Sequence, residues 1–111
     1  GGAGIEIVEL FTPVVAAPAG AEPLELRAAP NPFNPSTTIW YTVRGPGHLS
    51  LKIYNVRGEL VKTLIDGRVE ASSSIEWDGT NNAGAKVSSG VYFYEARMGG
   101  EVQVKKLALV K

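Results

Sequence analysis

The strongest structural signal in the sequence is a pair of strand-like runs near its C-terminal end, separated by two glycines. Residues 91–98 are rich in β-branched and aromatic side chains, and residues 102–109 resume a strand pattern after Gly99 and Gly100. Consecutive glycines supply the positive φ angles that a two-residue hairpin turn requires. The sequence therefore predicts a closing β-hairpin, and this hairpin constrains the fold more than any other segment does.

Five further short runs are predicted to be strands, and all but residues 60–65 alternate between two faces, as half-buried strands do. They lie at residues 24–28, 37–43, 49–54, 60–65 and 72–77. Turn signals separate the runs at intervals of about 8–12 residues, and no window keeps a helical period of about 3.6 residues. The chain is therefore predicted to be all-β, as an immunoglobulin-like antiparallel β-sandwich of about seven strands.

The connections between these runs carry their own signals. Turns are predicted at residues 45–47, at residues 56–59 and at Asp66-Gly67, and a loop is predicted at residues 78–84. Three prolines within residues 30–35 exclude both a helix and a central strand there. This segment is predicted to be a rigid corner that places Phe33 in the core. The other residues predicted to be largely buried are Ile39, Tyr41, Leu51, Ile53, Ile75, Trp77, Tyr92 and Tyr94.

Composition excludes several classes of function. The 111 residues fit one domain and contain 0 Cys, so no disulfide framework, thiolate metal site or thiol nucleophile is expected. The 11 basic and 11 acidic residues balance, which gives no electrostatic case for nucleic acid. No apolar run approaches the roughly 18 residues of a membrane span, so no membrane insertion is expected.

The beginning of the chain differs from the rest in its amino-acid composition. Residues 12–23 are rich in Ala, Pro and Gly and are typical of a semi-extended linker. Residues 5–11 are interpreted as a short strand, either at the end of a preceding domain or as an addition to this one. We therefore expect an N-terminal segment and linker at 1–22, a compact domain at 23–111, and a larger parent protein.

A search for catalytic residues is mostly negative. His48 is the only histidine, and no serine lies in a nucleophile-elbow motif, so neither an enzyme nor a bound cofactor is expected. Asp78, Thr80 and Asn82, at spacings of two, offer the oxygen ligands that Ca²⁺ prefers. The favoured interpretation is a loop whose Asp and Asn side chains bind their own backbone, because the acidic residue that would complete a calcium loop is missing. Metal is therefore not expected.

The aromatic side chains suggest a further surface. The tyrosines and Trp77 could line a sugar-stacking platform, but their alternating positions favour the core. Trp40 shares its phase with Thr38 and Thr42 and is predicted to point outward. An outward Trp marks a contact surface or is covered by residues 5–11.

Five motifs, in this order, resemble a known family. They are PNPFNPSTTI (30–39), LKIYNVRGELVKTL (51–64), WDGTNNAG (77–84), SGVYFY (89–94) and KKLALVK (105–111). Together, over about residues 24–111, they resemble the C-terminal sorting domain of the type IX secretion system, which is related to the immunoglobulin-like domain of the flagellar hook-capping protein. The sequence departs from the pattern at Ser73-Ser74, where similar domains often have Gly and His, and at Trp40, where they often have a polar residue.

The resemblance implies a non-catalytic signal domain that directs a larger secreted cargo through the periplasm to the cell surface or the medium. The implied partners are the outer-membrane translocon and its sortase-like peptidase, which would cut in the linker at residues 12–23. The residues implied or suggested in partner recognition are Gly90, Val91, Tyr92, Lys105, Lys106, Leu107 and Lys111. An edge strand read by strand addition, with lysines that discourage self-pairing, fits this role.

Two other functions remain open from the sequence. One is an adhesive or carbohydrate-binding appendage of a surface enzyme, which would expose a row of aromatic residues, whereas Trp40 alone fits. The other is the immunoglobulin-like domain of a hook-capping protein, which would be inserted in a longer scaffold.

Overall fold

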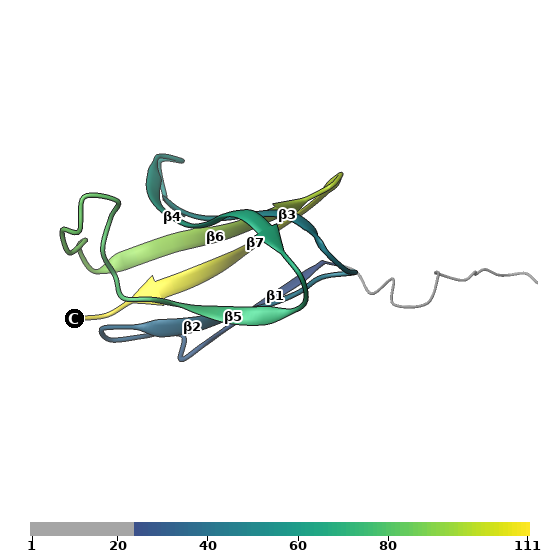
Figure 1. Ribbon diagram of the computed structural model, residues 1–111. Helices are drawn as coiled ribbons and strands as arrows, with labels where there is room; N and C mark the ends of the chain where they lie inside the picture. Colours follow the sequence, from purple (N-terminus) through teal and green to yellow (C-terminus); the bar gives the residue numbers. More distant parts are fainter. Residues whose placement is uncertain (1–23) are drawn as a thin grey trace, which may run out of the picture.

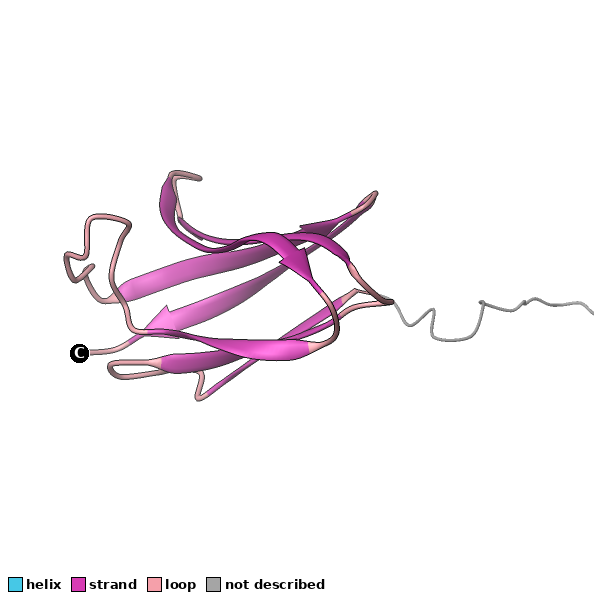
Figure 2. Cartoon of the chain, in the orientation of Figure 1, coloured by secondary structure: helices cyan, strands magenta, loops and turns pink. Residues whose placement is uncertain are grey.

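The computed structural model describes residues 24–111, which form a sandwich of two antiparallel sheets with no helix (Figures 1 and 2). The linker predicted at residues 12–23 and the strand predicted at residues 5–11 lie outside the described part. The strands are β1 (Glu25–Ala29), β2 (Thr37–Thr42), β3 (Gly47–Asn55), β4 (Leu60–Val69), β5 (Ser73–Trp77), β6 (Gly90–Met98) and β7 (Glu101–Leu109).

The seven strands form one sheet in the order β1-β2-β5 and a second in the order β4-β3-β6-β7. All paired strands are antiparallel, and β6 and β7 form the predicted closing hairpin. Its turn is Gly99-Gly100, in which Gly99 has a φ of 61°. The predicted fold class, an immunoglobulin-like sandwich, is confirmed.

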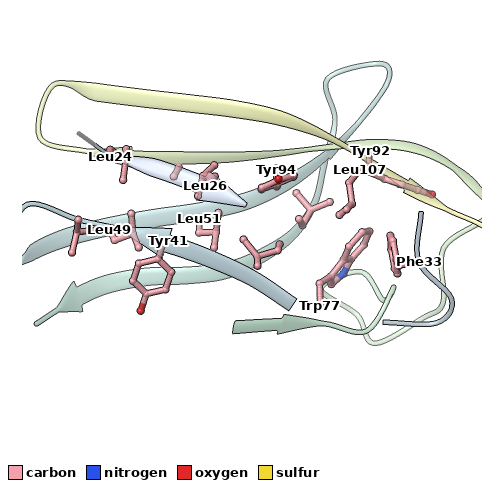
Figure 3. Close-up of a cluster of buried hydrophobic side chains, with 14 of the residues drawn as sticks. Leu24, Leu26, Phe33, Tyr41, Leu49, Leu51, Trp77, Tyr92, Tyr94 and Leu107 are labelled. Atoms are coloured by element: carbon pink, nitrogen blue, oxygen red, sulfur yellow. The ribbon is translucent and has the colours of Figure 1, made fainter. Parts of the chain in front are cut away.

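The core lies between the two sheets, where the inward residues of each strand meet (Figure 3). Trp77 is fully buried, near one end of the cluster (Figure 3), with ring centroids of Phe33 and Tyr92 each 5.4 Å away. Eight of the nine predicted core residues, Phe33 among them, are confirmed as buried, and Ile75 is half-buried against the cluster. Ile75 lies on β5, at the edge of the three-stranded sheet, which explains its remaining exposure.

The proline-rich corner joins the two sheets. β1 pairs with β2 of the first sheet. The corner that follows β1 then reaches β7 of the second sheet, where Phe33 forms a parallel bridge with Leu109. The Phe33 amide donates to the Ala108 carbonyl at 2.9 Å, and the Val110 amide donates to the Phe33 carbonyl at 3.0 Å. The predicted burial of Phe33 is therefore confirmed, and its backbone also ties down the end of the last strand.

The turn predicted at Asp66-Gly67 is wrong. Both residues lie within β4, where they pair with Ser50 and Leu49 of β3. Gly67 has no positive φ, and the ladder with the long β3 continues to Val69. The local preference of Asp-Gly for turns is outweighed here by pairing with a distant strand.

Candidate partner-binding end of the sandwich

A groove lies at the end of the sandwich where the β3–β4 turn, the start of β6 and residues 81–89 meet. It has a volume of about 470 Å³ and is lined by both apolar and polar side chains from these segments. The motif residues Gly90, Val91 and Tyr92 line one side of it, and Asn55, Val56 and Arg57 line another. The structure thus brings two motifs, separated in sequence, to one concave surface.

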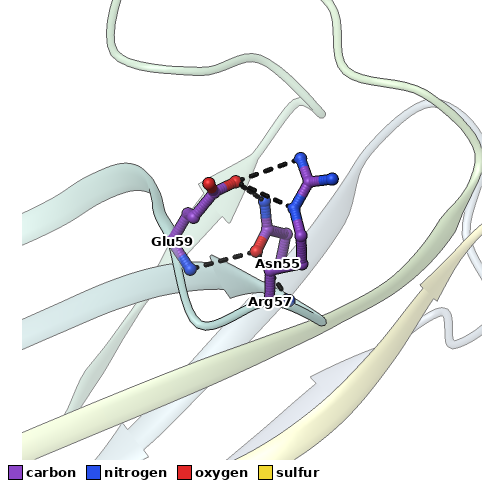
Figure 4. Close-up of polar contacts among 3 residues, drawn as sticks. All are labelled: Asn55, Arg57 and Glu59. Atoms are coloured by element: carbon purple, nitrogen blue, oxygen red, sulfur yellow. Dashed lines mark hydrogen bonds and ion pairs between the residues drawn. The ribbon is translucent and has the colours of Figure 1, made fainter.

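The β3–β4 turn on this groove is held rigid by one asparagine. The Asn55 side-chain oxygen accepts hydrogen bonds from the backbone amides of Arg57 (2.9 Å) and Glu59 (3.0 Å), while its Nδ2 donates to the Glu59 carboxylate (Figure 4). Arg57 also pairs with Glu59 at 3.2 Å. These contacts hold the pKa of Glu59 below its usual range, with the Asn55 hydrogen bond as the main cause.

This ordered turn exposes an apolar residue. Val56 is 69% exposed at its tip, and Leu60 and Val91 are exposed beside it. A rigid turn that presents a valine to solvent loses little entropy when a partner covers it. The turn is therefore the part of this end best suited to bind an apolar partner surface. This turn, residues 55–59 of the motif at 51–64, is not among the residues predicted for recognition.

The predicted recognition residues fall into two groups. Tyr92 and Leu107 are core residues, and the Tyr92 hydroxyl donates to the Ser88 carbonyl at 2.6 Å. A partner cannot touch Leu107 without opening the fold, because this residue is fully buried. The residues that a partner can reach are Val91, Lys105, Lys106 and Lys111, which are exposed, and Gly90, whose φ of 155° favours glycine.

The edge of β7 is only half open. The Asn31 Oδ1 accepts a hydrogen bond from the Ala108 amide (3.0 Å), and the Asn31 Nδ2 donates one to the Lys106 carbonyl (3.1 Å). With the two Phe33 bonds, the corner occupies the outward backbone groups from the Lys106 carbonyl to the Val110 amide. The alternation of an antiparallel ladder then directs the backbone groups of Val102 and Val104 away from β6. Within residues 24–111, no hydrogen bond from that side reaches them.

The Asp78 loop binds its own atoms. The Asp78 carboxylate accepts from the hydroxyl (2.5 Å) and the amide (3.1 Å) of Thr80, and the hydroxyl contact is the main reason that the pKa of Asp78 is lowered. Asn82 is turned to another partner, since its Oδ1 accepts from the Thr63 amide at 3.0 Å. The structure therefore does not bring the three candidate ligands together on one point, and no group of three acidic or histidine side chains suited to a metal occurs among residues 24–111.

We expect calcium to leave this loop unchanged. Millimolar CaCl₂ should give no specific heat of binding in calorimetry, because the oxygens of Asp78, Thr80 and Asn82 are already engaged. A chelator should leave the melting temperature where it was. A rise of several degrees with Ca²⁺ that the chelator reverses would contradict this.

Trp40 lies away from this end, on the outer face of the three-stranded sheet. It is exposed, as predicted, and the guanidinium carbon of Arg27 lies 4.3 Å from its ring centroid. The structure thus separates the sequence-predicted contact residues into two surfaces.

His48 is paired with Asp66 at 2.7 Å on the exposed face of the other sheet. Residues 24–111 contain no helix that could cross a membrane.

These features define a small immunoglobulin-like β-sandwich domain. The family model of the FlgD Ig-like domain matches residues 36–100, and the chain belongs to this family. No curated protein matches the sequence.

Two solved structures show the same kind of fold. One is dimeric latent PorU from Porphyromonas gingivalis, which is 22% identical with a TM-score of 0.67 over 94% of this chain. The other is PorZ of the same organism, a surface component of its type IX secretion system, which is 20% identical with a TM-score of 0.56 over 78% of this chain. The chain spans only 10% and 11% of the length of these two proteins.

Proposed function

We propose that this domain is a non-catalytic sorting signal that directs a larger protein through the type IX secretion system to the cell surface or the medium. The observation that carries the proposal is the position of the reachable motif residues. Val91, Lys106 and Lys111 are exposed near the end where the rigid turn presents Val56. A translocon component that binds the domain would read this end, and the linker at residues 12–23 would be the place of cleavage.

Three further points support this function. The sequence resembles sorting domains along about residues 24–111, and one similar solved structure, PorZ, is itself a component of this secretion system. Lys105, Lys106 and Lys111 form no salt bridge with residues 24–111, so their charge is available to an acidic receptor. The hook-cap function is less well supported, because it rests on the family name alone.

Export of a fusion protein tests the proposal. Residues 12–111 would be fused behind a periplasmic reporter in a host with a type IX system, and the fusion should reach the surface or the medium. The double variant Lys106→Ala/Lys111→Ala should remain in the periplasm while its stability changes by less than about 0.5 kcal/mol, because both side chains are exposed.

The matched controls distinguish recognition of surface side chains by the secretion system from a requirement for the folded domain. Arg68→Ala removes an exposed basic side chain from β4, at the opposite end of the β3–β4 ladder from the proposed end, and should be exported normally. Leu107→Asp places a charge in the core and should abolish folding and export together. If the reporter fused to the Leu107→Asp domain, or with no domain at all, is exported as well as the intact fusion, the domain is not a sorting signal.

A further inference from the structure

We propose that the outer face of the β1-β2-β5 sheet, around Trp40, is a binding site for an acidic oligosaccharide. Most of the site lies on the other sheet from the groove of the proposed sorting function, and Lys105 of β7 borders it. The proposal does not depend on that function. We call it the Trp40 site and define it by Glu25, Arg27, Trp40, Thr42, Ser72 and Lys105, which line one groove.

The exposure of Trp40 is the first observation. The chain has two tryptophans, of which Trp77 is 0% exposed and Trp40 is 36% exposed. The neighbours of Trp40 in phase on β2 are Thr38 and Thr42, so this face needs no large apolar residue for packing. An exposed indole on a polar sheet face adds nothing to the core and is typical of a contact residue.

The second observation is how the ring is held. The sheet register places Arg27 of β1 directly opposite Trp40, with the guanidinium over the ring at 4.3 Å. On the other side, the register places Ser74 of β5 opposite Trp40. A cation therefore fixes one face of the indole, while the small serine leaves room beside it.

The third observation concerns the neighbours of Trp40 on β5. The structure pairs Trp40 directly with Ser74 and Tyr41 with Ser73. Both serines are exposed on this edge strand, so small polar side chains lie beside the indole.

The fourth observation is the chemistry of the groove. Its volume is about 480 Å³, within the usual range of roughly 300–1,000 Å³ for ligand sites. Thr42 supplies a hydroxyl, and the Ser72 hydroxyl, whose oxygen accepts from the Val43 amide at 2.9 Å, keeps its O–H to donate. Arg27 and Lys105 supply two positive charges against the one carboxylate of Glu25. Neither Arg27 nor Lys105 has a salt bridge to any residue from 24 to 111.

These features favour a sugar over a peptide strand. β2 is the central strand of its sheet, so its backbone groups are used by β1 and β5 and cannot receive an added strand. A pyranose ring offers a flat C–H face to the indole and hydroxyls to Thr42 and Ser72. A carboxylate on the sugar, as in a uronic acid, offers Arg27 and Lys105 the charge-assisted hydrogen bonds that they lack.

Titration with trigalacturonate tests the site in the whole chain. The fluorescence of Trp40 should shift on binding while that of the buried Trp77 stays constant, and the neutral maltotriose should bind at least about tenfold more weakly. By calorimetry, Trp40→Ala and Arg27→Gln should each weaken binding of trigalacturonate by about tenfold. Val104→Ala, an exposed apolar change on the other sheet, should leave binding unchanged.

Three results would overturn the proposal. The first is no binding of trigalacturonate at millimolar concentration. The second is equal binding by Trp40→Ala, whose far-UV circular dichroism should match that of the parent chain because the side chain is exposed. The third is equally tight binding of triglutamate, which would mean that the groove attracts negative charge without recognising a sugar.

Discussion

Replacing Trp77 by alanine is expected to lower the free energy of unfolding by about 3–5 kcal/mol, the usual cost of removing a large aromatic side chain from a core. Trp77 is fully buried against Phe33 and Tyr92, so the change leaves a cavity between the two sheets. Its Nε1 donates to the Thr80 carbonyl at 2.9 Å, and this carbonyl would lose its partner as well. Urea denaturation followed by far-UV circular dichroism measures the loss.

Two matched variants separate the contribution of the buried ring from those of its N–H donor and of the exposed tryptophan. Trp77→Phe keeps most of the packing but removes the N–H donor, so it should cost clearly less than alanine. Trp40→Phe changes the exposed tryptophan and should change stability by less than about 0.5 kcal/mol. If Trp77→Ala unfolds at the same urea concentration as the parent chain, the packing between the sheets does not depend on this residue.

Local sequence patterns predicted most of the fold because the alternation of short strands is a local property. The hairpin at Gly99-Gly100 and the burial of Phe33 follow from residues that are neighbours in sequence. The turn predicted at Asp66-Gly67 failed because the pairing that decides it is with β3, about 16 residues earlier by the register Ser50–Asp66. Local preference and distant pairing conflicted there, and pairing prevailed.

The candidate sites were less predictable for a similar reason. Lys106 and Leu107 are adjacent in the motif, yet one is exposed and the other is core, which only the strand register reveals. The contacts of Asn31 with Lys106 and Ala108 span 75 and 77 residues, so no sequence window contains both partners. The expectation of a free edge on the last strand therefore needed the structure to show which half is covered.

Replacing Phe33 by alanine is expected to release the second half of β7 and to cost about 3–5 kcal/mol of unfolding free energy. Phe33 is buried against Trp77, and this packing holds its backbone in place beside Ala108 and Val110. Without the ring, the corner should detach more often than the rest of the sheet. Amide hydrogen exchange followed by NMR measures this residue by residue.

In the parent chain, the amides of Ala108 and Val110 should exchange slowly, because they donate hydrogen bonds to the Asn31 side chain and the Phe33 carbonyl, respectively. The amides of Val102 and Val104 should exchange fast. In Phe33→Ala, protection of Ala108 and Val110 should fall more than that of Tyr94, which lies on the central strand β6.

Phe93 lies on the outer face of β6, opposite Lys106. Phe93→Ala should leave the protection of Ala108 and Val110 relative to that of Tyr94 unchanged. Equal loss of protection at Tyr94 and Ala108 in Phe33→Ala would mean that the corner opens only when the whole domain unfolds. A partner that pairs with the second half of β7 must first displace the corner, whereas Val102 and Val104 can be paired without that step. The measured cost of opening the corner therefore sets how tightly such a partner must bind.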